Sequence, residues 1–378
     1  MSTSRLGEVF RYSGILVFAL AVSAPVAELA FRMAGDVPSH DLSGLYEPFG
    51  GSSYKLRPSV DTDAYWATGR VAVHTDALGL RADLKRRFGA RPGDAVDIIL
   101  AGDSQGFGNG VNFENSLAGV IAERAAREGY RVVNAAVGGH SLTTQLALVR
   151  WLHEARGLRA AHLVVLLTPA MIRGCDSPNV AVVGADGRLY GDEVSVSART
   201  RLWMKTHVVL YSRLRDAIRN LGIGTDPARH SSDVFQFYEP GEKEQELQNR
   251  LYSCMSQLSE FSRRQGLATH LIYVPLTIEA DFEPIRRAAA HDGAHLDIEV
   301  PYRVSRLVAG HFGLPLSSLR PTLEAQHARG IMLNVKADFH YSAALSAACG
   351  ASAWAALDLP PRPAWQHETR GETESGSH

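Results

Sequence analysis

The stretch IILAGDSQGFGNGV, residues 98–111, indicates the fold of this chain. Its first four residues are apolar and run directly into Gly102, Asp103 and Ser104, and three more glycines follow. A short apolar run that ends in such a turn is typical of a strand buried in a parallel sheet. Alone, the stretch leaves open whether Ser104 is a nucleophile at the end of a strand or only a polar residue in a turn.

The residues that follow alternate between apolar runs and amphipathic helices. Further strands are predicted at 130–137, 162–168 and 269–276, and helices at 115–128, 141–156 and 242–265. Asn115 or Ser116 is expected to cap the first helix, and Ser141 the second. The alternation predicts a three-layer α/β/α domain with a central parallel sheet over residues 95–357, interrupted by an insertion at 174–241.

Ligands of such sheets lie beyond the carboxyl ends of the strands. The segment VVNAAVGGHS, residues 132–141, follows the second strand, and VKADFHYS, residues 335–342, lies near the C-terminus. Asp338 and His340 are one residue apart, so both side chains point to the same side of an extended chain. The carboxylate can then hold one imidazole nitrogen while the other faces a nucleophile. Alternatively, Asp338 caps the last helix and His340 is a surface residue.

Together, GDSQGFG, VVNAAVGGHS and DFHYS resemble the SGNH, or GDSL, hydrolase superfamily over about residues 95–357. The resemblance implies that Ser104 is the nucleophile, His340 its base and Asp338 the acid that orients the base. It also implies that the backbone N–H groups of Ser104 and Gly139 form the oxyanion hole. The N-terminal segment with HTDALGLR after it resembles membrane-tethered bacterial members of the superfamily.

Two further polar residues of these turns are interpreted as structural support. Asp103 and Asn134 are expected to hold their turns through hydrogen bonds to the backbone. Alternatively, Gly138 and Gly139 only allow the loop to turn, because glycine is common wherever a turn needs a positive φ.

The stretch LLTPAMIRG, residues 166–174, departs from the family pattern. The family usually has Gly-x-Asn-Asp here, and the Asn side chain completes the oxyanion hole, but Pro169 stands about where Asn is expected and Ala170 where Asp is expected. Proline has neither an N–H nor a polar side chain, and losing one donor typically costs about 3–4 kcal/mol in the transition state. Either Arg173 or Asn109 substitutes, or the enzyme is slow, or its chemistry differs. The short Asp-x-His spacing resembles O-acetyltransfer proteins of bacterial polysaccharide export and some tethered esterases.

Composition excludes several classes of protein. The formal charge of −1 provides no basic field for nucleic acid. Cys175, Cys254 and Cys349 lie far apart and form no Cys/His cluster, so no zinc site is expected, whereas one disulfide bridge stays open. The predicted chemistry needs neither a metal nor an organic cofactor.

Residues 12–31 form an apolar run after two arginines, close to the roughly 20 residues that cross a bilayer. The arginines favour a cytoplasmic N-terminus, which places the domain in the periplasm. Residues 1–35 are therefore predicted to be an inner-membrane anchor, that is, an N-terminal transmembrane helix. A cleaved signal peptide and a soluble helix are the alternatives. Residues 36–94 are interpreted as an extension that packs on the domain, and 358–378 as a flexible tail.

The sequence thus predicts an exported serine esterase for acyl esters, acetyl esters first, on surface glycans. His340 would remove the proton of Ser104, which attacks the acyl carbonyl. One alternative is an O-acyltransferase that takes its acyl group from a membrane donor partner and passes it to cell-surface polysaccharide. Another is a domain with a decayed site that binds glycan or acts as a scaffold.

Overall fold

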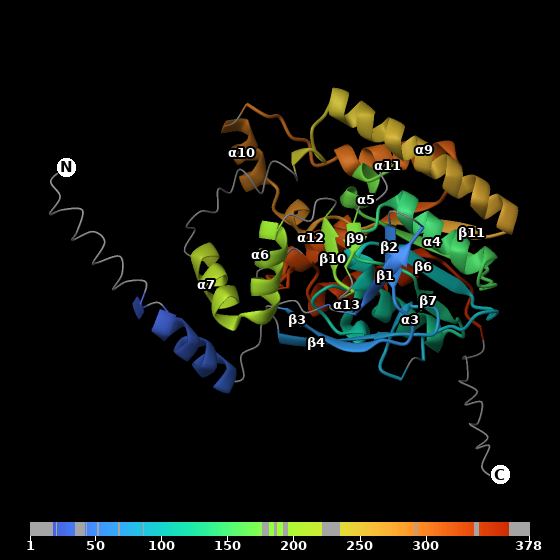
Figure 1. Cartoon of the computed structure of the whole chain (residues 1–378). Helices are drawn as coiled ribbons and strands as arrows, with labels where there is room; N and C mark the ends of the chain where they lie inside the picture. Colours follow the sequence, from blue (N-terminus) through green and yellow to red (C-terminus); the bar gives the residue numbers. More distant parts are fainter. Residues whose placement is uncertain are drawn as a thin grey trace, which may run out of the picture.

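The computed structural model describes residues 18–19, 21–34, 42, 44–50, 53–66, 69–85, 87–175, 181–184, 187–191, 196–220, 235–291, 293–335 and 340–362. The largest sheet in this part of the chain has eight strands in the order β12-β11-β8-β6-β7-β5-β4-β3. Figure 1 labels several of these strands, among them β6, β7 and β11. Its parallel strands are β6 (Ile98–Gly102), β7 (Val132–Asn134), β8 (His162–Leu167), β11 (Ala268–Tyr273) and β12 (Leu316–Ser318). The first four of these strands are the predicted ones, whereas β12 was not predicted.

Helices cover both faces of this sheet. Successive residues of β6 point to opposite faces: Ile99 and Ala101 belong to one apolar core, Ile98 and Leu100 to the other. The first core also contains residues of α4 (Leu142–Glu154), α9 (Glu242–Gln265) and α11 (Val300–His311). The second contains residues of α3 (Leu117–Arg127), α12 (Arg320–Ala328) and α13 (Ala343–Ala356). The predicted three-layer α/β/α architecture is confirmed.

The N-terminal extension continues the sheet. After the hairpin of β1 (Tyr46–Phe49) and β2 (Ser53–Leu56), the chain forms β3 (Asp61–Trp66), β4 (Gly69–Thr75) and β5 (Arg81–Ala82). These last three strands are antiparallel, and β5 pairs with β7 so that Arg81 lies opposite Asn134. The sheet is therefore mostly parallel rather than wholly parallel, because the extension adds its own strands to one edge.

Serine side chains begin three of the helices. Ser116 accepts a hydrogen bond from Gly119 N at the start of α3, and Ser141 accepts one from Thr144 N at the start of α4. Both caps agree with the sequence pattern. The last helix, α13, is capped by Ser342. Asp338, the cap suggested as an alternative, lies outside the described residues.

The insertion at 174–241 forms a group of small elements. They are β9 (Ala181–Val183), β10 (Leu189–Gly191), α6 (Val196–His207) and α7 (Val209–Asn220), and α5 (Pro169–Arg173) directly precedes them. The remaining short elements are α2 (Ser104–Phe107), η1 (Phe113–Asn115), η2 (Thr277–Ala280) and α10 (Glu283–His291). The three cysteines are buried and free, so none of them forms the disulfide that the sequence left open.

The described part of the N-terminal helix is residues 18–19 and 21–33, and the predicted anchor also includes residues outside the described ones. In the part of the chain that the structure describes, no helix combines the length and apolarity that a membrane span requires.

Candidate active site

Ser104 lies at the carboxyl edge of the sheet. It is the first residue of α2, directly after β6, and the Asp103 side chain caps this helix by accepting a hydrogen bond from Gln105 N at 2.9 Å. A Cβ on Gly106 would come within 2.9 Å of the Ala136 Cβ, so α2 packs directly on the chain after β7. Only glycine permits this approach, which fixes where Ser104 stands.

The structure brings His340 to the Ser104 turn. Tyr341 N donates to Gln105 Oε1 at 3.1 Å, which joins the residues that follow the predicted base and nucleophile. The His340 side chain is almost fully buried, and its carbonyl accepts from Val335 N at 2.8 Å. Asp338 lies outside the described residues, so its role stays a prediction.

Asn109 reaches the same place from the loop after α2. Its Nδ2 lies 3.3 Å from His340 Nε2. A Cβ on Gly138 would lie 3.6 and 3.7 Å from the Oδ1 and Nδ2 atoms of Asn109, and 3.8 Å from the Ser104 Cβ. Because an amide nitrogen only donates, Asn109 presents a donor beside the nucleophile and the base.

Arg81 holds the loop that carries Asn109. This arginine is fully buried; it donates to the carbonyls of Phe107, Gly108 and Val111, the last two at 2.7 Å, and lies 4.4 Å over the Phe107 ring. Burial lowers the pKa of Arg81 to about 10, which still leaves the guanidinium charged at neutral pH. Its sequence context, HTDALGLR, suggested a family resemblance but no such role for the residue.

Tyr54 holds the second loop. Its hydroxyl donates to the carbonyl of Gly138 at 2.9 Å. Gly139 has a φ of +81°, and a Cβ there would lie 2.6 Å from the Tyr54 hydroxyl. Asn134 accepts from Ala136 N at 3.0 Å and donates to the carbonyl of Gly106 at 3.2 Å, which ties this loop to α2. The Gly139 N–H is thereby carried on a closely supported turn.

His140 belongs to the support of this loop. Its Nε2 is 2.8 Å from the carbonyl of Tyr54, and its Nδ1 is 3.2 Å from Gln145 Oε1. Burial lowers the pKa of His140 to about 4, so the ring is neutral at neutral pH.

The lowered pKa of His140 predicts a pH effect on stability. The unfolded chain binds a proton at this ring below its ordinary pKa of about 6.5, and the folded chain does so only near 4, so stability is lost as pH falls through this window. His140→Gln should reduce that loss by up to about 3 kcal/mol. Urea unfolding at pH 7 and pH 4.5 would show it, and an unchanged pH slope would contradict it.

The third block has a different role from the one in the family pattern. Thr168 caps α5 by accepting from Met171 N, and its hydroxyl donates to Asp103 Oδ2 at 2.5 Å. Pro169 is buried as the first residue of that helix. Burial raises the pKa of Asp103, and the Thr168 hydroxyl opposes this shift. Residues 168–170 therefore support the Ser104 turn and offer no amide side chain.

Two residues were suggested as substitutes for the missing Asn. Asn109 contacts the predicted base, His340. Arg173 lies 5.7 Å over the Phe237 ring, and its carbonyl accepts from Arg250.

Thr168→Val should destabilise the protein by about 2–3 kcal/mol, because the buried Asp103 loses one donor and α5 loses its cap. Thr322→Val is a matched control, since the Thr322 hydroxyl bonds Ser352 at a half-buried place. Chemical denaturation measures both variants. If both variants lose the same free energy of unfolding, the hydrogen bond to Asp103 contributes no more to stability than a half-buried one.

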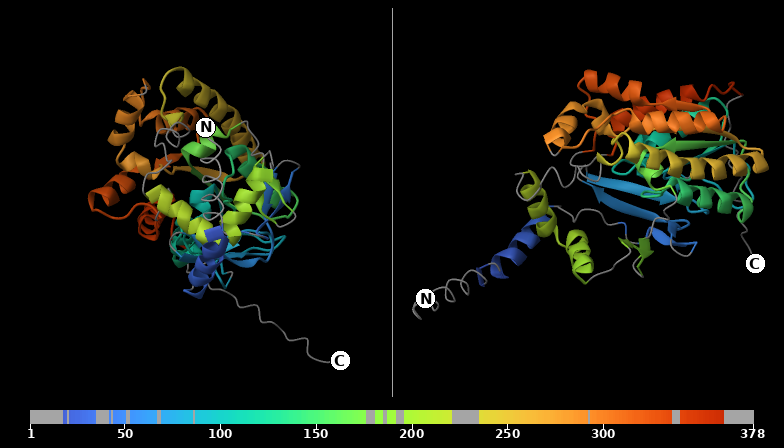
Figure 2. Two further views of the ribbon diagram at one scale, coloured as in Figure 1. Left: turned by 60° about the vertical axis from the view of Figure 1, so that its left-hand side comes forward. Right: turned by 90° about the horizontal axis from the view of Figure 1, so that it is seen from above.

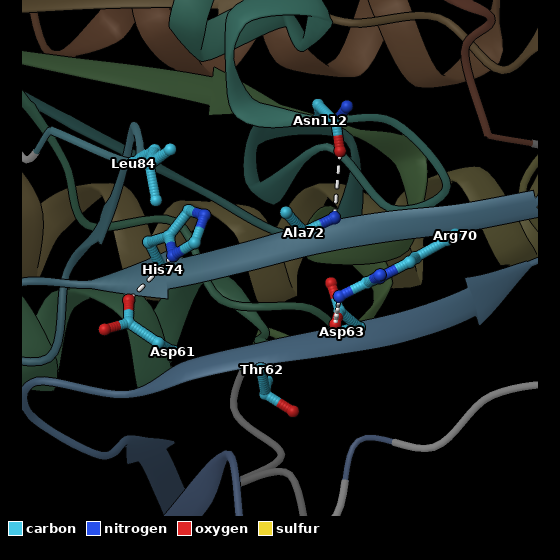
Figure 3. A pocket seen from close by; sticks show the side chains of 8 residues that line it. All are labelled: Asp61, Thr62, Asp63, Arg70, Ala72, His74, Leu84 and Asn112. Carbon is cyan, nitrogen blue, oxygen red and sulfur yellow. Dashed lines mark hydrogen bonds and ion pairs between the residues drawn. The ribbon is translucent and has the colours of Figure 1, made fainter.

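A hollow of about 500 Å³ lies elsewhere, over β3 and β4 (Figure 3). The polar groups in it pair across these strands, with Asp61 Oδ1 2.7 Å from His74 Nδ1 and Asp63 paired to Arg70. None of the predicted site residues lines it. The described residues contain no group of three His, Cys, Asp or Glu side chains that could hold a metal ion.

No protein-family model and no curated protein matches this chain. The solved structures that match include TesA, at 17% identity and a TM-score of 0.37, covering 70% of this chain and 98% of that one. They also include a protein from Desulfitobacterium hafniense described as lipolytic and of the G-D-S-L family, at 12% identity and a TM-score of 0.38, covering 69% and 99%. An acetylxylan esterase from Geobacillus stearothermophilus matches at 9% identity and a TM-score of 0.37, covering 71% and 96%.

The description of the Desulfitobacterium hafniense protein names the G-D-S-L family, which the three sequence motifs resemble. At such identities and TM-scores they assign neither a reaction nor a substrate to this chain, so the site is interpreted from its own residues.

Proposed function

We propose that this chain is a serine hydrolase of the SGNH superfamily that cleaves acyl esters at Ser104, with His340 as the base. One observation carries the proposal. Two residues that follow Ser104 contact the late histidine segment: Gln105 bonds to Tyr341, and Asn109 contacts His340. The two residues of each pair are more than 230 positions apart in the sequence. A plain turn would not need contacts to a buried histidine segment from the far end of the chain.

The reaction begins when His340 Nε2 accepts the Ser104 proton and the serine oxygen bonds to the acyl carbonyl carbon. The N–H groups of Ser104 and Gly139 stabilise the oxygen that gains negative charge. The alcohol leaves with the proton from His340. Water then attacks the acyl-enzyme, giving one proton to His340, and the acid departs as Ser104 regains its hydrogen.

We assign the third oxyanion donor to the Nδ2 of Asn109. In the free protein this group donates to His340 Nε2, the atom that must accept the serine proton. Turning Nδ2 from the imidazole to the oxyanion therefore frees the base while it completes the hole. Pro169, which stands where the family has its donor Asn, cannot supply this hydrogen bond because its side chain is apolar.

No side chain lies between Asn109 and Ser104 at Gly138, and a Cβ there would lie 3.6–3.8 Å from atoms of both residues. We propose an acetyl ester as the substrate, carried by a surface glycan if the domain is exported.

Active-site labelling tests the proposal. A fluorophosphonate probe should label the wild type at Ser104 and leave Ser104→Ala unlabelled, because only an activated serine attacks the probe at a useful rate. Absence of labelling in a folded wild type would contradict the proposal and favour a glycan-binding or scaffold role. Acetyl transfer to an oligosaccharide in competition with water would separate an acyltransferase from an esterase.

Export is a separate proposal, based on the two arginines before the apolar run. A phosphatase reporter fused after residue 357 should be active in the periplasm. A reporter that works only in the cytoplasm would contradict it.

A further inference from the structure

The N-terminal helix joins the two helices of the insertion, and the three lie together beside the three-layer body (Figures 1 and 2). Glu28 accepts hydrogen bonds from Val209 N at 3.1 Å and Leu210 N at 2.8 Å, which places a carboxylate at the start of α7. Arg32 pairs with Glu28 and donates to the carbonyl of His207 at 2.5 Å. These contacts link segments 175 or more positions apart, so we treat the three helices as one unit and call it the helical unit.

One side of the N-terminal helix is an exposed apolar stripe. Five large apolar side chains are 53–80% exposed: Phe18, Val22, Val26, Leu29 and Met33. Their spacing of three or four residues places them within an arc of about 80° of the helix. The partly buried residues Ala24, Ala27 and Phe31 lie on the opposite side. The stripe therefore faces away from the packed side of its own helix.

The insertion helices also expose large apolar side chains. On α6, Val196 and Trp203 are seven residues apart, and Trp203 is 55% exposed. On α7, Leu214 and Ile218 are four residues apart. Both spacings put the members of each pair on one face of their helix. Single exposed apolar side chains are normal on the surface of a soluble protein, whereas here several large ones are exposed on three helices that contact each other.

The charges of these helices are almost all positive. The sequence of α6 has three basic residues and no acidic one, and that of α7 has three basic residues and one acidic one. Basic helices with exposed Trp and Leu side chains have the composition of segments that lie in the interface of an anionic bilayer.

We propose that the helical unit is a membrane-docking surface that binds an anionic bilayer, with the side chain of Trp203 in the interface. The proposal goes beyond the esterase function and does not depend on it. A second copy of the chain fits less well, because a two-fold dimer would bring two copies of the same basic helices together. A bilayer with anionic headgroups satisfies both the charge and the apolar side chains.

The predicted anchor at residues 12–31 would hold the chain on a membrane with or without this surface, so the test must report on the insertion itself. We would reconstitute the full chain in vesicles of phosphatidylcholine and phosphatidylglycerol whose acyl chains carry bromine near the headgroup. Bromine quenches nearby tryptophan fluorescence. The difference between the wild type and Trp203→Phe isolates the signal of Trp203, which should be strongly quenched. In vesicles of phosphatidylcholine alone, the quenching should weaken.

Leu214→Glu with Ile218→Glu should lower the Trp203 quenching at least about tenfold, since two apolar contacts are lost and two negative charges face anionic lipid. The control is Met332→Glu, at a residue that is 70% exposed on the body, which should leave the quenching unchanged. The circular dichroism spectrum and the thermal midpoint of each variant confirm that it is folded.

Three results would overturn the proposal. The first is a Trp203 signal that bromine does not quench. The second is quenching that Leu214→Glu and Ile218→Glu leave intact. The third is a dimer, detected by light scattering, in which a second copy shields Trp203 from the lipid.

Discussion

Ser104→Ala and His340→Ala are each expected to lower kcat by about 10⁴–10⁶-fold, and the double variant should be little worse than either single one. The reason is that nucleophile and base act as one unit: without the base the serine keeps its proton, and without the serine the base has nothing to activate. Initial rates with an aryl acetate and with an acetylated oligosaccharide measure the effect.

Matched controls separate this loss from damage to the fold. Ser256→Ala and His327→Ala change the same residue types at exposed helix positions and should retain activity. If the losses in the double variant multiply, Ser104 and His340 act independently, and the assignment of the pair fails. A residual rate that is equal in all three variants would be the contribution of the oxyanion donors and of binding.

Asn109→Ala should lower kcat by about a hundredfold to a thousandfold with a smaller change in KM, because the amide binds the oxygen mainly in the transition state. Activated aryl esters should suffer least, since good leaving groups need less charge stabilisation. Asn112→Ala is the control: this residue follows in the same loop, and its side chain bonds only to the backbone of Ala72 among the contacts described.

Pro169→Asn makes the same test from the other side. If Asn109 is the third donor, an Asn at position 169 brings no gain in kcat in a variant that still folds. A clear gain, together with an Asn109→Ala variant that is fully active, would show that the hole has only its two backbone donors and that the assignment of Asn109 is wrong.

Local patterns were enough for the elements that depend on local chemistry. The long helix α9 runs over the predicted residues, and Ser116 and Ser141 cap α3 and α4, because apolar periodicity and capping are properties of a few neighbouring residues. The strand β5 has only two residues, and its place in the sheet is set by its pairing with β7. No local pattern specifies that pairing, which is why the extension was expected only to pack on the domain.

The candidate site shows the same division. Ser104 and His340 lie in the short motifs GDSQGFG and DFHYS, which the sequence shows directly. Asn109 was suggested only as one of two substitutes for the missing oxyanion Asn. Arg81 and Tyr54 gave no signal, because each acts on a loop more than 25 positions away. Buried polar side chains of this kind are visible only when their acceptors are known.

The pairing of the extension with β7 affects the order in which this chain can fold. Residues 53–82 are synthesised first, yet their partners are the loop after α2 and the chain after β7. Gly138, the partner of Tyr54, follows it by 84 residues. Until the extension pairs with β7, the edge of β7 is open to pairing with other chains. The carbonyls of Phe107, Gly108 and Val111 then also lack their hydrogen bonds from Arg81. A fragment that starts at residue 95 would stay in this unfinished state, so we expect it to aggregate rather than to behave as a smaller esterase.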